Sequence, residues 1–154
     1  AFGSSRQERN ETIVKLAIIY QNNYSDLCTI ARRNEDDARH WARPWQERYW
    51  NSEFSDADED NCEYIVSDMN DTRYHCLNLE NSATVEFRMW GATNNANEIR
   101  AFADFTQAII KVAKDMSFDE AKDVEFKDLL HMVVEEAFNA DNVSALIKNT
   151  YGEF

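Results

Sequence analysis

Residues that break regular structure are scarce in this chain, and their scarcity constrains the fold more than any other feature. One proline, Pro44, and three glycines, Gly3, Gly91 and Gly152, interrupt 154 residues. Proline and glycine are the strongest local breakers of helices and strands, so long uninterrupted elements are expected. Apolar side chains also recur at helical spacing over much of the chain. The sequence therefore predicts a mainly helical protein.

Capping residues and apolar spacing locate the expected helices. Residues 11–21 have apolar side chains at helical spacing, a pattern typical of a half-buried amphipathic helix. Asn34 can cap a helix that begins at Glu35, and Ser117 with Glu120 forms a capping-box pattern. The expected helices span residues 11–21, 25–30, from 35 onward, 62–66, about 98–114, from 118 onward, 124–138 and 141–148.

The segment 73–93, RYHCLNLENSATVEFRMWGAT, departs from the helical pattern. It predicts two adjacent strands, about 74–80 and 83–90. Strand side chains alternate between faces, so Glu86 and Arg88 are expected on one face. In a regular strand, alternation also places His75 on the face opposite Asn78. The expected fold class is α+β, mainly helical with a small antiparallel sheet.

The composition favours one domain that covers residues 1–154. Hydrophobic residues make up 44% of the chain, which is enough for a real core at this length. Nineteen aromatic residues argue against disorder, although 29% of the residues are charged. We find neither an internal repeat nor a linker that would divide the chain.

Charge and cysteine content exclude several classes of function. The formal net charge of −13 argues against direct binding to nucleic acid or to anionic lipid. Cys28, Cys62 and Cys76 are widely spaced and form no Cys-x-x-Cys motif, which favours a reducing cytosol over a disulfide framework or a zinc site. No apolar run approaches the ~20 residues needed to span a bilayer, and no signal peptide opens the chain. We therefore expect a cytoplasmic protein without a membrane partner.

Residues 51–61, NSEFSDADEDN, form the most charge-rich stretch with few apolar side chains. Asp56, Asp58 and Asp60 alternate as at the start of an EF-hand loop. An EF-hand requires glycine at its sixth position and glutamate at its twelfth, where Asn61 and Ser67 stand instead. We expect a flexible, solvated loop here.

The segment 73–93 resembles the C-terminal signature of the amidoligase family, which belongs to the ATP-dependent carboxylate–amine ligases with a glutamine-synthetase-like fold. The resemblance is specific over residues 73–113. The matching residues are Arg73, Tyr74, Leu77, Asn78, Leu79, Thr84, Val85, Glu86, Phe87, Arg88 and Thr93. The resemblance implies that the predicted sheet belongs to the C-terminal part of a glutamine-synthetase-like fold.

The resemblance also implies roles for individual residues. Glu86 matches the glutamate that binds a divalent cation, here Mg²⁺. Arg88 matches the arginine that contacts phosphate of ATP or of the acyl-phosphate intermediate, which makes it a catalytic and cofactor-binding residue. Arg73 and Asn78 match positions in the active-site cleft, where Arg73 would also contact the cofactor, and Thr93 closes the motif in a structural role. The implied reaction forms an amide or isopeptide bond on a peptide or amino-acid substrate.

The chain departs from the family in its N-terminal portion. The family carries a Gly-x-Glu-x-Glu strand that supplies further metal ligands, whereas this chain contains no Glu-x-Glu. The chain is therefore expected to represent the C-terminal part of an amidoligase-like domain, or a degenerate member that is inactive alone. A protein partner or a second copy would complete the site.

Two other interpretations compete with the ligase. The first is a non-catalytic, acidic protein-interaction module on the same fold, of a phage type that mimics nucleic acid toward a basic partner. The second is a purely structural helical domain in which Glu86 and Arg88 form an exposed ion pair. Convergence of Glu86, Arg88, Asn78 and Arg73 on one concave surface would favour the ligase.

Overall fold

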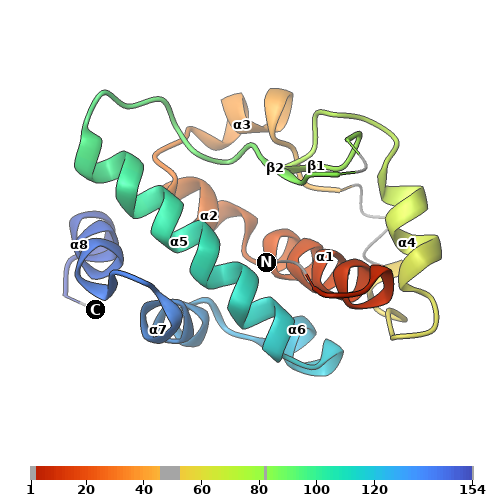
Figure 1. Cartoon of the computed structure of the whole chain (residues 1–154). Coiled ribbons are helices and arrows are strands. Elements are labelled where there is room, and N and C mark those ends of the chain that lie inside the picture. Colours follow the sequence, from red (N-terminus) through yellow and green to blue (C-terminus); the bar gives the residue numbers. More distant parts are fainter. Residues whose placement is uncertain (1–2, 46–52, 82, 154) are drawn as a thin grey trace.

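The computed structural model describes residues 3–45, 53–81 and 83–153, and in these ranges the protein is mainly helical with a two-stranded antiparallel sheet (Figure 1). This confirms the expected α+β class. The elements in chain order are α1 (Arg6–Asn22), α2 (Tyr24–Ile30), α3 (Glu35–Trp41), α4 (Cys62–Met69), β1 (Leu77–Asn78), β2 (Glu86–Phe87), α5 (Ala96–Asp115), α6 (Phe118–Asp123), α7 (Phe126–Glu136) and α8 (Ala140–Tyr151).

Helix α1 lies at the centre of the molecule and is buried around nearly its whole circumference. Every residue from Thr12 to Tyr20 is buried, and the helix packs against α2, α4, α5 and α6. The helix begins earlier than expected because the Ser5 side chain accepts a hydrogen bond from the backbone N–H of Glu8 at 3.1 Å. The expectation of a half-buried helix over residues 11–21 is wrong, since neighbouring helices cover all of its sides.

Lys15 is a charged residue within this buried helix. Its Nζ donates hydrogen bonds to the carbonyl oxygens of Lys114, at 3.1 Å, and Met116, at 2.7 Å. These carbonyls lie at the C-terminal end of α5, where backbone acceptors lack helical partners and a positive charge is favourable. Burial lowers the pKa of Lys15. Lys15 thus fixes α1 to the end of α5.

Helix α5 runs between α1 and the pair α7 and α8 (Figure 1). The Asn95 side chain caps it by accepting from the backbone N–H of Asn97 at 3.0 Å. Phe105 and Ile109 on this helix are completely buried. Ile99, near the start of the helix, is 53% exposed. One face of α5 packs against α1, and the other packs against α7 and α8.

The two strands are shorter than the expected ranges of 74–80 and 83–90. Only Leu77 pairs with Phe87 and Asn78 with Glu86. The chain before β1 hydrogen-bonds elsewhere: the Arg43 N–H donates to the Tyr74 carbonyl at 2.9 Å, and the Cys76 N–H donates to the Arg43 carbonyl at 3.0 Å. Residues 74–76 therefore bridge to Arg43, although the Cys76 carbonyl still accepts from the Arg88 N–H, just after β2, at 2.9 Å.

Side-chain turns end the ladder on its other side. The Asn78 Oδ1 accepts from the Glu80 N–H at 3.1 Å, and the Asn81 Oδ1 accepts from the Ala83 N–H at 2.9 Å. Asparagine side chains that bond nearby backbone groups in this way compete with a strand ladder. The hairpin therefore bends away from regular pairing directly after Asn78.

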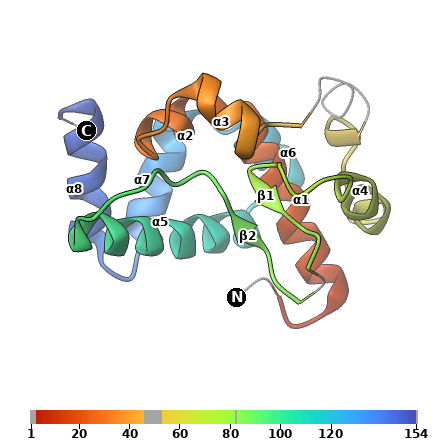
Figure 2. The same ribbon diagram turned by 90° about the horizontal axis from the view of Figure 1, so that it is seen from above.

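The hairpin lies over α1, and the chain after β2 runs from there to the end of α2 (Figure 2). The rings of Tyr20 on α1 and Phe87 on β2 are 6.1 Å apart. The Gly91 N–H donates to the Ala31 carbonyl at 2.8 Å, and the Arg33 Nε donates to the Trp90 carbonyl at 3.2 Å. Helices α4 and α8 lie at opposite ends of the molecule in both views.

Residues 3–45, 53–81 and 83–153 contain no helix with both the length and the apolar character required to cross a membrane.

Candidate functional site

The β ladder brings three of the residues named by the family resemblance together. Asn78 and Glu86 lie directly opposite each other, and the Asn78 Nδ2 donates to the Glu86 Oε2 at 2.8 Å. The Arg88 Nη1 lies 3.5 Å from the Glu86 Oε1. The carboxylate of Glu86 is thus held between an amide and a guanidinium.

Arg88 also connects the ladder to α3. Its Nε donates to the Trp41 carbonyl at 2.9 Å, and Trp41 is the last residue of α3. That carbonyl belongs to the group of helix-terminal acceptors that lack an intrahelical partner. The Arg88 side chain is 22% exposed, whereas the Glu86 side chain is 57% exposed. The guanidinium therefore has a structural partner in addition to Glu86.

Arg73 is exposed and lies beside the ring of Tyr74. Its Nη2 donates to the Tyr74 hydroxyl at 3.2 Å, and its guanidinium carbon lies 5.2 Å from the centre of that ring. The Tyr74 hydroxyl, with smaller contributions from Glu80 and Glu86, raises the pKa of Arg73. Among the described residues, Arg73 therefore bonds its chain neighbour Tyr74 and forms no ion pair with Glu86.

Thr93 and His75, two further polar residues of this segment, contact structural partners. The Thr93 Oγ1 donates to the Glu98 carboxylate and accepts from the Asn95 N–H at 3.1 Å, so it helps to begin α5. The His75 side chain is buried, with its Nε2 2.8 Å from the Asp71 Oδ1 and its ring stacked 4.9 Å from that of Trp45. Burial lowers the pKa of His75. His75 thus points into the core.

The described residues around Glu86 show no composite metal site. No group of three or more His, Cys, Asp or Glu side chains within residues 3–45, 53–81 and 83–153 is arranged to hold a metal ion. Five cavities lie among the described residues, and none of them is lined by Arg73, Asn78, Glu86 or Arg88. The binding of Mg²⁺ by Glu86 and of ATP by Arg88 and Arg73 stays a prediction.

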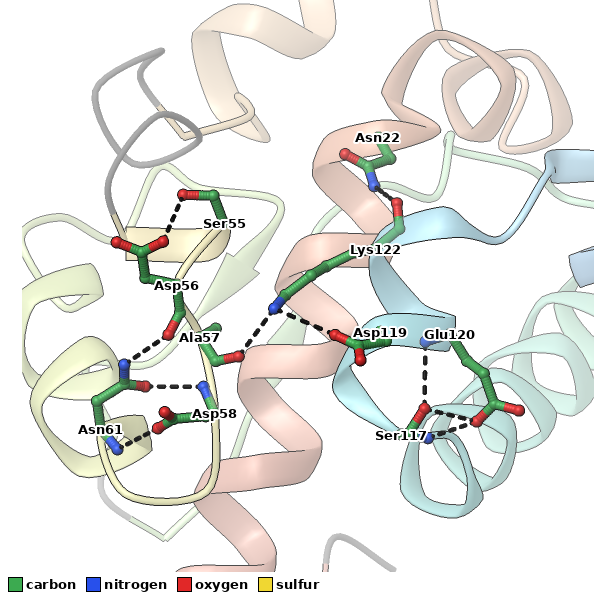
Figure 3. Close-up of polar contacts among 10 residues, drawn as sticks. All are labelled: Asn22, Ser55, Asp56, Ala57, Asp58, Asn61, Ser117, Asp119, Glu120 and Lys122. Atoms are coloured by element: carbon green, nitrogen blue, oxygen red, sulfur yellow. Dashed lines mark hydrogen bonds and ion pairs between the residues drawn. The ribbon is translucent and has the colours of Figure 1, made fainter.

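A second group of polar residues lies where the loop of residues 55–61 meets α6 (Figure 3). Both segments carry exposed carboxylates, and we call this surface the acidic face. Its members are Asp56, Asp58, Glu59, Asp60, Asp119 and Asp123. The Glu120 side chain points away from the loop, toward Ser117 (Figure 3).

Lys122 connects the two segments of the acidic face. Its Nζ donates to the Ala57 carbonyl at 3.0 Å and lies 3.7 Å from the Asp119 Oδ1 (Figure 3). The Asn22 Nδ2 donates to the Lys122 carbonyl at 2.9 Å, which fixes α6 to the end of α1. The Lys122 side chain is only 20% exposed. Its charge is therefore directed to the protein rather than to solvent.

Hydrogen bonds hold the loop of the acidic face in one conformation. The Asp58 Oδ1 accepts from the N–H groups of Asp60, at 3.0 Å, and Asn61, at 3.1 Å. The Asn61 side chain in turn bonds the Asp58 N–H at 3.0 Å and the Asp56 carbonyl at 2.8 Å. Ala57 is buried beneath the loop. The expected flexible loop is therefore anchored in residues 55–61, although its carboxylates are exposed.

A capping box begins α6, the helix that carries Asp119 and Asp123. The Glu120 N–H donates to the Ser117 Oγ at 3.2 Å, and the Glu120 Oε2 accepts from the Ser117 N–H at 2.7 Å (Figure 3). The bonds that the Glu120 carboxylate accepts from the Ser117 N–H and, at 2.9 Å, from the Ser117 hydroxyl lower the pKa of Glu120. The predicted capping box is confirmed.

The segments that supply the acidic face are poor in basic residues. Residues 53–72 contain eight acidic residues and neither Lys nor Arg, and residues 115–136 contain eight acidic residues and two Lys. Carboxylates gathered with few cations produce a negative potential that extends into solvent. The sequence analysis did not predict this face. The signal that could have indicated it is the absence of Lys and Arg from residues 49–72.

Comparison of the chain with known protein families, with curated proteins and with solved structures found no match. The resemblance to the amidoligase family therefore stays a prediction.

Proposed function

We propose that this chain is a non-catalytic, acidic protein-interaction module, and that its acidic face binds a basic surface of another protein. One observation carries this proposal. Lys122 joins the loop of residues 55–61 to α6 through the Ala57 carbonyl, so that carboxylates about 60 residues apart in the sequence form one surface.

Charge complementarity is the physical basis of the proposed binding. A dense negative surface attracts a basic partner over the Debye length, about 8 Å at physiological ionic strength, and orients it before contact. Like-charged partners are repelled, which adds specificity. Because Lys122 is engaged with Ala57 and Asp119, it offers little competition to cations of the partner.

Anchoring of the loop supports the same function. Association costs free energy when flexible segments must become ordered in the complex. The bonds from Asp58 and Asn61 already fix the loop that presents Asp56 and Asp60. The class of partner that fits is a protein whose own surface binds nucleic-acid phosphates, since that surface is basic and accepts a patterned array of negative charge.

The test compares two variants with equal loss of charge. The first replaces Asp56, Asp60, Asp119 and Asp123 with Asn. The control replaces Asp36, Glu80, Asp141 and Glu153 with the corresponding amides, which are exposed residues away from this face. A synthetic lysine-rich peptide is titrated into each protein by calorimetry at low and at moderate salt.

We expect the first variant to bind the peptide roughly thirty-fold more weakly than the wild type, because four exposed ion pairs contribute about 0.5 kcal/mol each. The control should lose much less affinity, and added salt should weaken wild-type binding. Equal loss in both variants would show that net charge alone, rather than the acidic face, attracts the peptide.

The ATP-dependent amidoligase is a second candidate. It is supported by the placement of Asn78, Glu86 and Arg88 on one face of the ladder. In this proposal Glu86 binds Mg²⁺, Arg88 and Arg73 contact ATP, and a partner or second copy supplies the remaining ligands and the cleft for a peptide or amino-acid substrate. Bidentate contact with phosphate is a geometry that arginine provides and lysine does not.

A thermal-shift titration with magnesium and ATP tests the second candidate. A ligand at 100 times its dissociation constant stabilises the folded state by about 2.7 kcal/mol. We expect this shift in the wild type and in the control Glu80→Gln, and we expect its loss in Glu86→Gln. If magnesium and ATP leave the melting temperature of the wild type unchanged, nucleotide binding by this chain is contradicted.

A further inference from the structure

A cavity between the N-terminal half of α1 and α4 combines positive charge with apolar walls. Its volume is about 550 Å³, which falls within the range of about 300–1,000 Å³ that small-molecule sites occupy. An adjacent cavity of about 370 Å³ shares Arg6, Asn10 and Glu63 with it and adds Glu59 and Asp60. The acidic residues of the second cavity disfavour an anion there, so the first is the candidate binding site.

The inner wall of the first cavity is apolar. Ile13 on α1 is 1% exposed, and Leu79, which follows β1, is 8% exposed. Tyr64 on α4 belongs to the same cavity and is 63% exposed. A ligand with an apolar body would cover these side chains and remove them from water, which is favourable in proportion to the area covered.

Asn10 is the buried polar residue of this cavity. It is 6% exposed and lines both cavities, yet within residues 3–45, 53–81 and 83–153 its side-chain amide has no hydrogen-bond partner. Asn23, the other buried asparagine, donates to the Ile19 carbonyl at 3.0 Å. The Asn10 amide is not among the fully buried polar atoms that lack a partner, so it keeps contact with the open cavity. The Asn10 amide is thus available to a ligand.

Arg9 supplies charge that no carboxylate of the described chain neutralises. The Arg6 Nη2 lies 2.6 Å from the Glu63 Oε1, whereas Arg9 forms no ion pair with any described residue. Both arginines lie in the first turns of α1, where the helix dipole adds positive potential. Since Glu63 compensates Arg6, the cavity carries about one uncompensated positive charge.

We propose that this cavity binds a small organic monocarboxylate with an apolar body. Arg9 contacts the carboxylate, the Asn10 amide donates a further hydrogen bond to it, and the apolar body packs on Ile13 and Leu79. A single uncompensated charge matches a monoanion better than a phosphate dianion, which Glu63 would repel. This site is separate from the binding of a basic protein proposed above.

The probe for this site is 3-phenylpropionate, and its neutral amide, 3-phenylpropionamide, is the matched control. Each is titrated into the full chain while the side-chain amide resonance of Asn10 is followed by NMR. We expect a saturable shift with the carboxylate and binding at least tenfold weaker with the amide, because the amide lacks the charge-assisted contact to Arg9.

Three variants locate the binding. Arg9→Gln should weaken binding of 3-phenylpropionate at least tenfold, while Arg100→Gln, which removes an exposed arginine of α5, should bind it as the wild type does. Asn10→Leu should remain folded, because it replaces an unpartnered amide with an apolar side chain of similar volume. This variant should also bind 3-phenylpropionate more weakly.

The proposal is overturned by any of three results: no saturable binding of 3-phenylpropionate at millimolar concentration, equal binding of its amide, or equal weakening by Arg9→Gln and Arg100→Gln. Wild-type affinity in folded Asn10→Leu, measured by the thermal shift that the probe induces, would likewise contradict it.

Discussion

Lys15, Gly91 and Lys122 each connect two segments that are distant in the sequence through a backbone carbonyl oxygen. Lys15 bonds the end of α5, Gly91 bonds the end of α2, and Lys122 bonds the loop of residues 55–61. Such contacts satisfy carbonyls that helix ends and loops leave without partners. Because every residue has a backbone carbonyl, the sequence pattern does not reveal which carbonyl accepts the hydrogen bond from a given donor.

Gly91→Ala tests the most crowded of these contacts. A Cβ at residue 91 would lie 2.8 Å from the Ala31 carbonyl oxygen and 2.9 Å from that of Arg32. Both atoms belong to the backbone at the end of α2, so neither can move without a shift of the chain. We expect a loss of about 1–3 kcal/mol in the free energy of unfolding, measured by urea denaturation.

Ala92→Ser is the control for this substitution, since Ala92 is the exposed neighbour of Gly91. It should change the free energy of unfolding by at most about 0.5 kcal/mol. Wild-type stability in Gly91→Ala would mean that the chain after β2 moves away from α2 at little cost.

At the scale of the elements, local signals predicted helix starts better than they predicted burial or strand length. Asn34 and Ser117 cap helices where the sequence places them, because a cap depends only on nearby residues. Helix α1 was misjudged because a helix covered on all sides need not show a wide polar face. The strands were overestimated because the backbone of Arg43 pairs with residues 74–76, a contact more than 30 residues apart in the sequence.

The candidate site likewise contains features that local sequence signals predicted and features that depend on distant contacts. Strand alternation predicted that Glu86 and Arg88 share a face, and the ladder adds Asn78 opposite Glu86. The bond from Arg88 to the Trp41 carbonyl depends on where α3 ends, so it was outside the reach of a strand pattern. The acidic face escaped prediction for a similar reason: its two halves meet only when α6 packs on α1 through Asn22.

Ser117→Ala tests how far the capping box supports α6. It removes the Ser117 Oγ, which accepts from the Glu120 N–H. Loss of such a cap typically costs about 1 kcal/mol. We expect this loss in urea denaturation, together with weaker binding of the lysine-rich peptide, because α6 presents Asp119 and Asp123.

Ser67→Ala is the matched control, since Ser67 is an exposed residue within α4 and alanine favours helices. It should leave the free energy of unfolding unchanged or slightly higher. If Ser117→Ala were equally harmless, packing of Ala121 and the bond from Asn22 would position α6 without the cap.

At the scale of the whole molecule, α1 contacts both of the surfaces that we propose for binding. Asn22 at its end holds α6 and the acidic face, while Arg9 and Asn10 near its start line the cavity against α4. Glu59 and Asp60 of the acidic face also line the adjacent cavity. The two surfaces therefore share the most deeply buried helix as their common support.

Native-state hydrogen exchange tests this central position of α1. Helices packed on several sides open only when the whole domain unfolds, whereas elements with few buried contacts open locally at lower free energy. We expect the backbone amides of Leu16, Ile18 and Ile19, all completely buried, to exchange with a free energy close to that of global unfolding. The exposed Asp119 and Glu120 on α6, a helix of six residues, should exchange at least tenfold faster. Amides of α1 that exchanged as fast as those of α6 would show that the core forms around another element, and the support that α1 gives to both surfaces would then have to come from α5.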